Sequence, residues 1–333
     1  MNIAHGLARG VRTGARTVFL VGALAIAPPT ARAQVPDTAE LFGAGTFSTG
    51  DWELPPTFTP DGDRAYFTVS TPVYGRMRFI LETRRRGNGW TTPVVAPFSG
   101  RYDDADPYIS PDGSRLFFLS KRPLTPGAAP KRDLDIWVMD RRGAAWSEPR
   151  HLGPTVNGPE DEHYVSMTTA GDLYIAAVRE DSHGAGDLYR VPKTAEGWGA
   201  PENLGSTVNG ADNHDTTPWV SPDGRYIIFS SRGRPDGAAD LDLYITTRGP
   251  DGAWTTPRNL GPAVNTRATE YCPIVSPDGR WLYFASTRNF AGGDLGAPVS
   301  GDELRRRLRG PGNSLGDTWR IALAPLLREA GIR

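Results

Sequence analysis

The chain of 333 residues contains a single cysteine, Cys272, and has almost no net charge. One cysteine excludes an intramolecular disulfide and any metal cluster held by several thiolates. Lysine and arginine number 37 against 38 aspartates and glutamates, so no excess of positive charge predicts a nucleic-acid partner. No long apolar run follows residue 27, so no transmembrane segment is expected in the mature protein.

The first 33 residues have the pattern of an export signal. Arg9, Arg12 and Arg16 precede a short apolar core at 18–27, and Ala31-Arg32-Ala33 matches an A-x-A cleavage site. We therefore expect a signal peptide over 1–33, cleaved after Ala33, and one domain over 34–333 that is periplasmic or secreted. A retained N-terminal anchor is the alternative.

Glycine and proline, by contrast, are abundant, with 39 and 30 residues, and they recur at fixed places. The phrase Thr-Pro-Asp-Gly at Thr59 returns as Ser-Pro-Asp-Gly at Ser110, Ser221 and Ser276, and as a degenerate Thr-Thr-Ala-Gly at Thr168. Successive copies are 51, 58, 53 and 55 residues apart. A period near this length is typical of folds in which each copy forms one supersecondary unit.

One copy predicts four strands. In 215–261, a strand at 217–221 leads into the Pro-Asp-Gly turn, and further strands are expected at 225–230, 242–246 and 254–260. Such a meander makes one propeller blade. We therefore predict an all-β fold, a single five-bladed β-propeller with blades at about 52–100, 101–156, 160–208, 212–264 and 268–323. The last copy lacks its fourth strand, and we expect 40–47 to supply it and close the ring.

The fourth strand of the other copies carries the pattern W-x-x-P, at Trp90, Trp146, Trp198 and Trp254. A tryptophan could serve as a stacking platform for sugars. Its even recurrence favours packing between blades, because aromatic side chains fill propeller interfaces.

These motifs resemble a known group of repeats. The phrase S-P-D-G, an aromatic strand, S-x-R and D-L-Y resembles the Pro-Asp (WD-like) propeller repeats of bacterial envelope proteins, which include the TolB propeller. The W-x-x-P-x-x-L-G and V-N elements are similar to copies found beside OmpA-type domains. The resemblance implies binding or scaffolding of an envelope protein or glycan. The chain departs from this pattern in two ways, because no peptidoglycan-binding domain accompanies the repeats and the third copy has lost the turn motif. Because of the first departure, direct anchoring to the cell wall is not expected.

Acidic residues stand six positions before each turn motif: Glu53, Asp104, Glu162, Asp215 and Glu270. Propeller geometry predicts that they ring one mouth of the central channel. Arginines at the end of the second strand should return to the same face: Arg122, Arg179, Arg232 and Arg288. One interpretation is a repeated arginine–carboxylate clasp that fixes the loops. The other is a mouth that binds a cation or a polyhydroxylated ligand.

Residues with a specific function are better sought at positions where one copy departs from the repeated pattern. Glu53 lacks an arginine because Ser70 and Thr71 stand in its place, so we expect a raised pKa, a metal ligand or a solvated carboxylate. His163 and His214 flank two of the acids, but strand alternation aims them to the other side. The loop from Arg288 to Gly316 contains a capping box at 300–303 and is expected to be a basic lid or disordered.

Three functions remain open. The preferred one is an exported, non-catalytic binding or scaffold module, expected to be a monomer without cofactor, which contacts an envelope protein or glycan through loops at the channel mouth. The second is a glycan-active hydrolase using Glu53, Asp104 and Asp215. The third is a propeller stabilised by calcium bound to the acidic ring.

Overall fold

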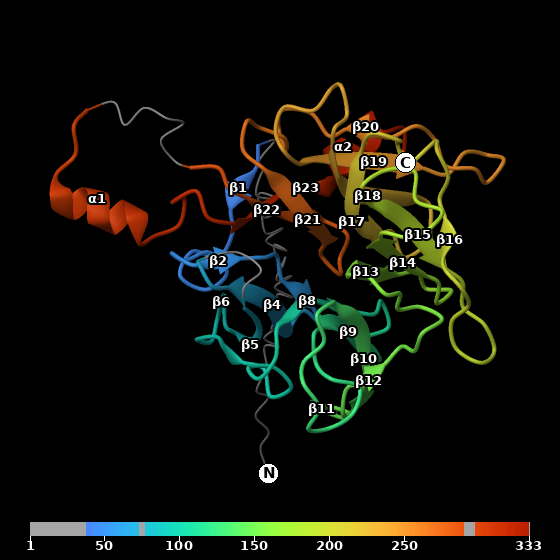
Figure 1. The fold of residues 1–333 in the computed structure, drawn as a ribbon. Coiled ribbons are helices and arrows are strands. Elements are labelled where there is room, and N and C mark those ends of the chain that lie inside the picture. The colour runs from blue at the N-terminus through green and yellow to red at the C-terminus, as the bar shows by residue number, and fades with distance from the viewer. Residues whose placement is uncertain (1–37, 73–76, 290–296, 333) are drawn as a thin grey trace, which may run out of the picture. The chain divides into compact units, whose positions relative to one another are not determined.

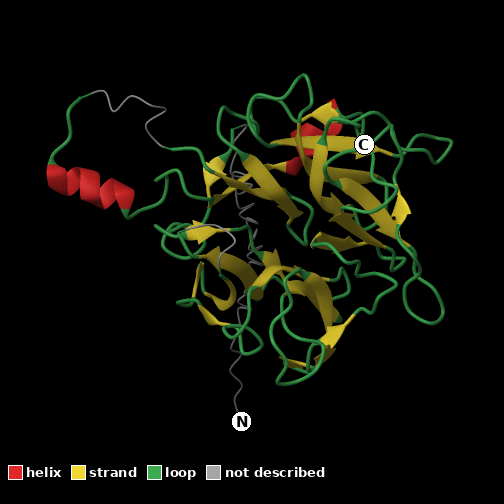
Figure 2. Ribbon diagram, in the orientation of Figure 1, coloured by secondary structure: helices red, strands yellow, loops and turns green. Residues whose placement is uncertain are grey.

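The computed structural model describes residues 38–72, 77–289 and 297–332. The expected signal peptide lies outside the described residues. Within them the chain is all-β, with five sheets that form the five blades of a β-propeller and only two short helices (Figures 1 and 2). The predicted fold is therefore confirmed. No helix in these three described segments is long and apolar enough to cross a membrane.

The fourth blade shows the basic unit. Its strands follow one another across the sheet in sequence order: β17 (His214–Val220), β18 (Tyr226–Arg232), β19 (Asp242–Thr247) and β20 (Arg258–Asn259). The outermost strand is shorter than predicted, because only Arg258 and Asn259 pair with β19.

The other blades repeat this order. The first contains β2 (Trp52–Glu53), β3 (Thr57–Phe58), β4 (Arg64–Ser70), β5 (Arg78–Arg86), β6 (Gly89–Trp90) and β7 (Val94–Val95). The second contains β8 (Asp104–Ile109), β9 (Arg115–Ser120), β10 (Asp135–Arg142), β11 (Ala145–Trp146) and β12 (Arg150–His151). The third contains β13 (Glu162–Met167), β14 (Leu173–Ala177), β15 (Asp187–Val191) and β16 (Glu202–Asn203). The fifth contains β21 (Glu270–Val275), β22 (Trp281–Ser286) and β23 (Asp317–Ala322).

The missing strand of the fifth blade comes from the other end of the domain. Strand β1 (Glu40–Leu41) pairs antiparallel with β23, with Leu41 opposite Trp319. Phe47, which follows β1 and is fully buried, packs edge-on against Phe67 and Trp90 of the first blade. The N-terminal segment therefore joins the fifth blade to the first, as predicted, and leaves no open edge on β23.

The repeated turn is held by its own side chains. In the second blade the Ser110 hydroxyl donates to Asp112 Oδ1 at 2.6 Å, and the same oxygen accepts from the Ser114 amide. Gly113 sits at φ 69°, a region that favours glycine. The Ser-Pro-Asp-Gly phrase thus encodes a tight turn between the inner two strands, on local chemistry alone.

The inner strands carry a second repeated feature. Asp106, Tyr164, Thr217 and Cys272 have φ values between 50° and 58°, each two residues after the inner carboxylate of its blade. The pairing register shifts at the same point, so each is a β-bulge. The first blade has Pro55 there, which cannot adopt a positive φ.

The W-x-x-P tryptophans pack between blades, as predicted. The Trp146 indole donates to the Tyr66 hydroxyl of the preceding blade at 2.9 Å. Trp254 likewise meets Tyr174 edge-on, with ring centroids 6.1 Å apart. Two helices complete the fold: α1 (Gly301–Leu308) and α2 (Leu323–Glu329).

Candidate functional site

The second blade shows how an inner carboxylate is held. Asp104, at the start of β8, is fully buried and accepts from the Ser120 hydroxyl at 2.6 Å and from Arg122 Nη2 at 2.9 Å. Arg122 Nε donates to the same serine, and its Nη2 also donates to the Phe98 carbonyl at 3.0 Å. The arginine therefore ties its carboxylate to the segment that enters from the preceding blade. We call this arrangement the clasp.

The fourth and fifth blades repeat the clasp. In the fourth blade Asp215 is held by Ser231 and by Arg234 Nη2 at 2.8 Å, and in the fifth Glu270 is held by Ser286 and by Arg288 Nη2 at 3.0 Å. The arginines also donate to the carbonyls of Val208 and Val264.

The assignment of Arg232 to the clasp is wrong. Arg232 pairs with Asp240, and its side chain is 53% exposed. It follows Ser231 directly in β18, and neighbouring residues of a strand point to opposite sides. Gly233, at φ 93°, then turns the chain so that Arg234 folds back to Asp215.

Two blades lack the bridging serine. In the third blade Ala177 lies opposite Glu162, and Arg179 Nη2 reaches Glu162 Oε1 at 3.2 Å. Among the described residues, Arg179 Nε and Glu162 Oε2 are buried without a hydrogen-bond partner. Burial therefore raises the pKa of Glu162 to about 8, even though Gly158 and Arg179 act to lower it.

In the first blade Val69 lies opposite Glu53, and no arginine within the described residues hydrogen-bonds to this carboxylate. Glu53 Oε1 accepts from the Thr49 hydroxyl, whereas Oε2 is buried without a partner in the described structure. Burial raises the pKa of Glu53 to about 8, and the nearby Asp317 carboxylate raises it further. Burial also raises the pKa of Asp317 to about 6. Two protonatable carboxyl groups thus lie at the junction of the fifth and first blades.

The acidic ring is therefore internal. Glu53, Asp104, Glu162, Asp215 and Glu270 are each 0–1% exposed, so their oxygens face protein groups and not solvent. Among the described residues, an arginine reaches the carboxylate in four of the five blades. The arrangement stabilises the packing of consecutive blades and holds their loops in place.

His163 and His214 are half-buried at the start of the third and fourth inner strands. Burial lowers the pKa of His163, the charge of Asp161 opposes that effect, and His214 and Arg78 add to it. The two imidazoles thus lie near each other, although strand alternation separates them from the acids. Across the part of the chain that the structure covers, no three His, Cys, Asp or Glu side chains are grouped to hold a metal ion.

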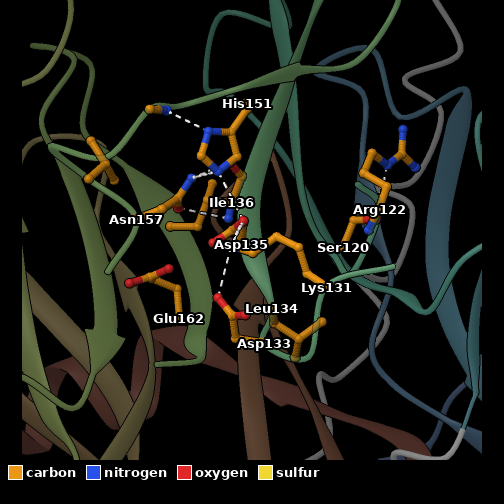
Figure 3. Close-up of polar contacts among 12 residues, drawn as sticks. Ser120, Arg122, Lys131, Asp133, Leu134, Asp135, Ile136, His151, Asn157 and Glu162 are labelled. Carbon is orange, nitrogen blue, oxygen red and sulfur yellow. Dashed lines mark hydrogen bonds and ion pairs between the residues drawn. The ribbon is translucent and has the colours of Figure 1, made fainter. Parts of the chain in front are cut away.

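A second polar layer was not predicted from the sequence. Asp135, at the start of β10, binds Lys131 Nζ and His151 Nε2, the latter at 3.0 Å (Figure 3). Burial would raise the pKa of Asp135, but the hydrogen bonds from His151 and Lys131 outweigh it and lower that pKa. The aspartate that recurs at the start of each D-L-Y strand is the sequence feature from which these contacts could have been predicted.

The V-N asparagines have a structural role. Asn157 accepts from the Ile136 amide at 2.9 Å and donates to the Ile136 carbonyl at 3.2 Å, so its side chain extends the sheet (Figure 3). Asn209 and Asn265 make the same pair of bonds to Leu188 and Leu243. The motif therefore anchors the segment that leads from one blade to the next.

The blade-5 loop contains α1, which the sequence predicted through its capping box. Ser300 caps the helix by accepting from the Glu303 amide. No residue of α1 is buried, and Leu304 and Leu308 are 45% and 59% exposed. Part of the expected lid, 290–296, lies outside the described residues. The G-x-S-x-G pattern at 312–316 ends at β23, which is a strand and not the helix that a nucleophile elbow needs.

Comparisons with known proteins find only distant similarities to solved structures. No family model matches the chain, and no curated protein matches it. Similar solved structures include TolB from Acinetobacter baumannii, with 16% identity and a TM-score of 0.47, covering 82% of this chain and 54% of TolB. An alpha-L-arabinofuranosidase from Lactobacillus brevis has 14% identity and a TM-score of 0.49, covering 84% of this chain and 92% of that one. The catalytic domain of the Coprinopsis cinerea GH62 alpha-L-arabinofuranosidase has 11% identity and a TM-score of 0.46, and the match covers 87% of this chain and 99% of that one. The chain thus spans about half the length of TolB.

Proposed function

We propose that this protein is an exported, non-catalytic binding or scaffold module of the bacterial cell envelope. Its ligand, an envelope protein or glycan, is contacted by the loops on the clasp side of the propeller. The observation that carries the proposal is the clasp itself. In the clasp the repeated carboxylates and arginines are buried inside the scaffold. The loops that differ between blades therefore determine which ligand binds.

The state of the carboxylates supports binding over hydrolysis. A glycoside hydrolase needs two carboxyl groups that both reach the scissile bond. Of its three candidates, Asp104 and Asp215 are each held by an arginine and a serine, and Glu53 is 1% exposed. A sugar cannot contact these oxygens without opening the blade junctions.

The fifth blade supplies the most distinctive loop. Leu304 and Leu308 lie one turn apart on α1 and are largely exposed. Arg306 and Arg307 pair with Glu303 on the same helix, which orders its basic side. An exposed apolar pair beside ordered charges suits contact with a partner, so we include α1 in the binding surface.

The test combines thermal melting with an assay for turnover. The exported protein is melted with calcium, with EDTA, with a panel of envelope glycans and with purified envelope proteins. We expect at least one glycan or protein to raise the melting temperature saturably, because a ligand of the native state stabilises it by mass action. No hydrolysis product should form.

A matched pair of variants locates the surface. Leu304→Asp with Leu308→Asp should weaken the shift, whereas Val94→Asp with Val95→Asp, on the outer strand of the first blade, should not. Val94 and Val95 are 57% and 50% exposed, so both double variants should fold. Product formation that Glu53→Gln abolishes would overturn the proposal in favour of the hydrolase. A melting shift seen only with calcium and reversed by EDTA would favour the calcium-stabilised propeller.

A further inference from the structure

A pocket opens at the opposite mouth of the channel, where the Pro-Asp-Gly turns meet. Its volume is about 390 Å³, and residues from all five blades line it, including Pro60, Pro111, Thr169, Pro222 and Pro277. Because each blade contributes its turn, the pocket lies on the propeller axis. It is therefore separate from the clasp-side loops.

The walls of this pocket carry no charge. None of the residues that line it is Asp, Glu, Lys, Arg or His. Its wall includes Tyr108, Trp219 and Tyr226, together with Ile274 of the fifth blade. Trp219 and Tyr226 form a tilted aromatic pair with ring centroids 5.9 Å apart. Burying a charged group here would leave that group unpaired, at a cost of several kcal/mol.

Most of the polar groups in the wall are already used. Ser110 and Ser276 donate to the aspartates of their own turns, and the Thr57 hydroxyl accepts from the Ile109 amide. The Trp219 indole N–H and the Tyr226 hydroxyl differ from these. Neither has a hydrogen-bond partner anywhere in the described part of the chain. Burial raises the pKa of Tyr226, so its hydroxyl keeps its proton.

We infer that the turn-side pocket is a binding site for an uncharged, largely aromatic small molecule with one or two hydrogen-bond acceptors. Trp219 and Tyr226 stack on the ligand and donate to its acceptors. A sugar fits this wall poorly, because its many hydroxyls would meet only a few free polar groups. The inference is independent of the proposed envelope function, since the two surfaces lie at opposite mouths.

The test uses prodan, a neutral naphthalene with a ketone acceptor whose emission shifts to the blue in an apolar site. We expect saturable binding with one site per chain. A naphthalene sulfonate with the same ring system should bind about 100-fold or more weakly. A trimer of N-acetylglucosamine should not displace prodan.

Two further variants test the position of the site. Thr169 is exposed at the rim, and its amide donates to the Pro222 carbonyl, which a side-chain change preserves. Thr169→Trp should fill the pocket and weaken prodan binding about 10-fold or more, whereas Ala170→Trp, next to it but outside the pocket, should not. Tyr226→Phe, which removes only the hydroxyl, should weaken binding about 2- to 10-fold.

Equal binding of prodan by wild-type protein and Thr169→Trp would overturn the inference. So would sulfonate binding as tight as that of prodan, or displacement of prodan by the sugar. Loss of glycan or protein binding on the clasp side leaves these results unchanged, so failure of the proposed function and failure of this site can be told apart.

Discussion

Glu162 lies directly opposite Ala177 in the third blade, and this alanine leaves the carboxylate without the hydroxyl that bridges it to arginine elsewhere. In the second blade Ser120 accepts from Arg122 Nε and donates to Asp104 at the same time. Burial raises the pKa of Glu162 to about 8, and no serine hydroxyl is present to oppose that effect by donating to the carboxylate. A single hydroxyl thus separates a complete clasp from an incomplete one.

Ala177→Ser should complete the clasp of the third blade. The new hydroxyl can donate to Glu162 and accept from Arg179 Nε, both of which have unpaired buried atoms. We expect about 1 kcal/mol of added stability in urea unfolding and a lower pKa of Glu162. The reverse change, Ser120→Ala, should cost about 1–3 kcal/mol. A loss of stability in Ala177→Ser would contradict the bridging role of serine.

The protein should lose stability as the pH rises from about 4.5 to 8. The pKa of Glu53 is raised from 4.5 to about 8, and so is that of Glu162. Between those values the folded state holds protons that the unfolded state has released. Each such proton lowers the free energy of unfolding by about 1.4 kcal/mol per pH unit.

Glu53→Gln should remove one of these two protons and reduce the slope by about 1.4 kcal/mol per pH unit. The measurement is urea unfolding at a series of pH values, with Glu196→Gln, an exposed glutamate, as the control. At pH 8 the variant should be more stable than wild type by about 3–5 kcal/mol. An unchanged slope would show that Glu53 ionises normally in the folded protein.

Arg234 and Arg232 should differ sharply in their contribution to stability. Arg234→Ala leaves the buried Asp215 carboxylate without its cation and should cost about 3–5 kcal/mol. Arg232→Ala breaks an exposed pair with Asp240 and should cost about 0–1 kcal/mol. Chemical denaturation of the two variants gives both numbers, and equal losses would contradict the clasp assigned to the fourth blade.

The junction between the first and fifth blades should depend on Phe47. This side chain is fully buried against Phe42, Phe67 and Trp90, so Phe47→Ala should cost about 3–5 kcal/mol. Leu124→Ala, at a residue that is 59% exposed, is the control and should cost little. The loss of stability in each of the two variants is measured by thermal melting. A small loss in Phe47→Ala would mean that the N-terminal segment does not hold the ring closed.

The sequence by itself determined the repeat, the number of blades and the closing strand. The Ser-Pro-Asp-Gly turn is made by contacts within five residues, and strand alternation is a local pattern, so both can be read without knowing the rest of the fold. The even spacing of the W-x-x-P tryptophans likewise predicted contacts between blades.

Only the tertiary structure decided how the polar residues are used. Arg234 replaces Arg232 because a turn at Gly233 folds the chain back, and spacing alone could not show that. The carboxylates are buried because neighbouring blades close over them, which depends on packing between distant segments. The uncharged pocket likewise forms only where five turns, far apart in the chain, meet on one axis.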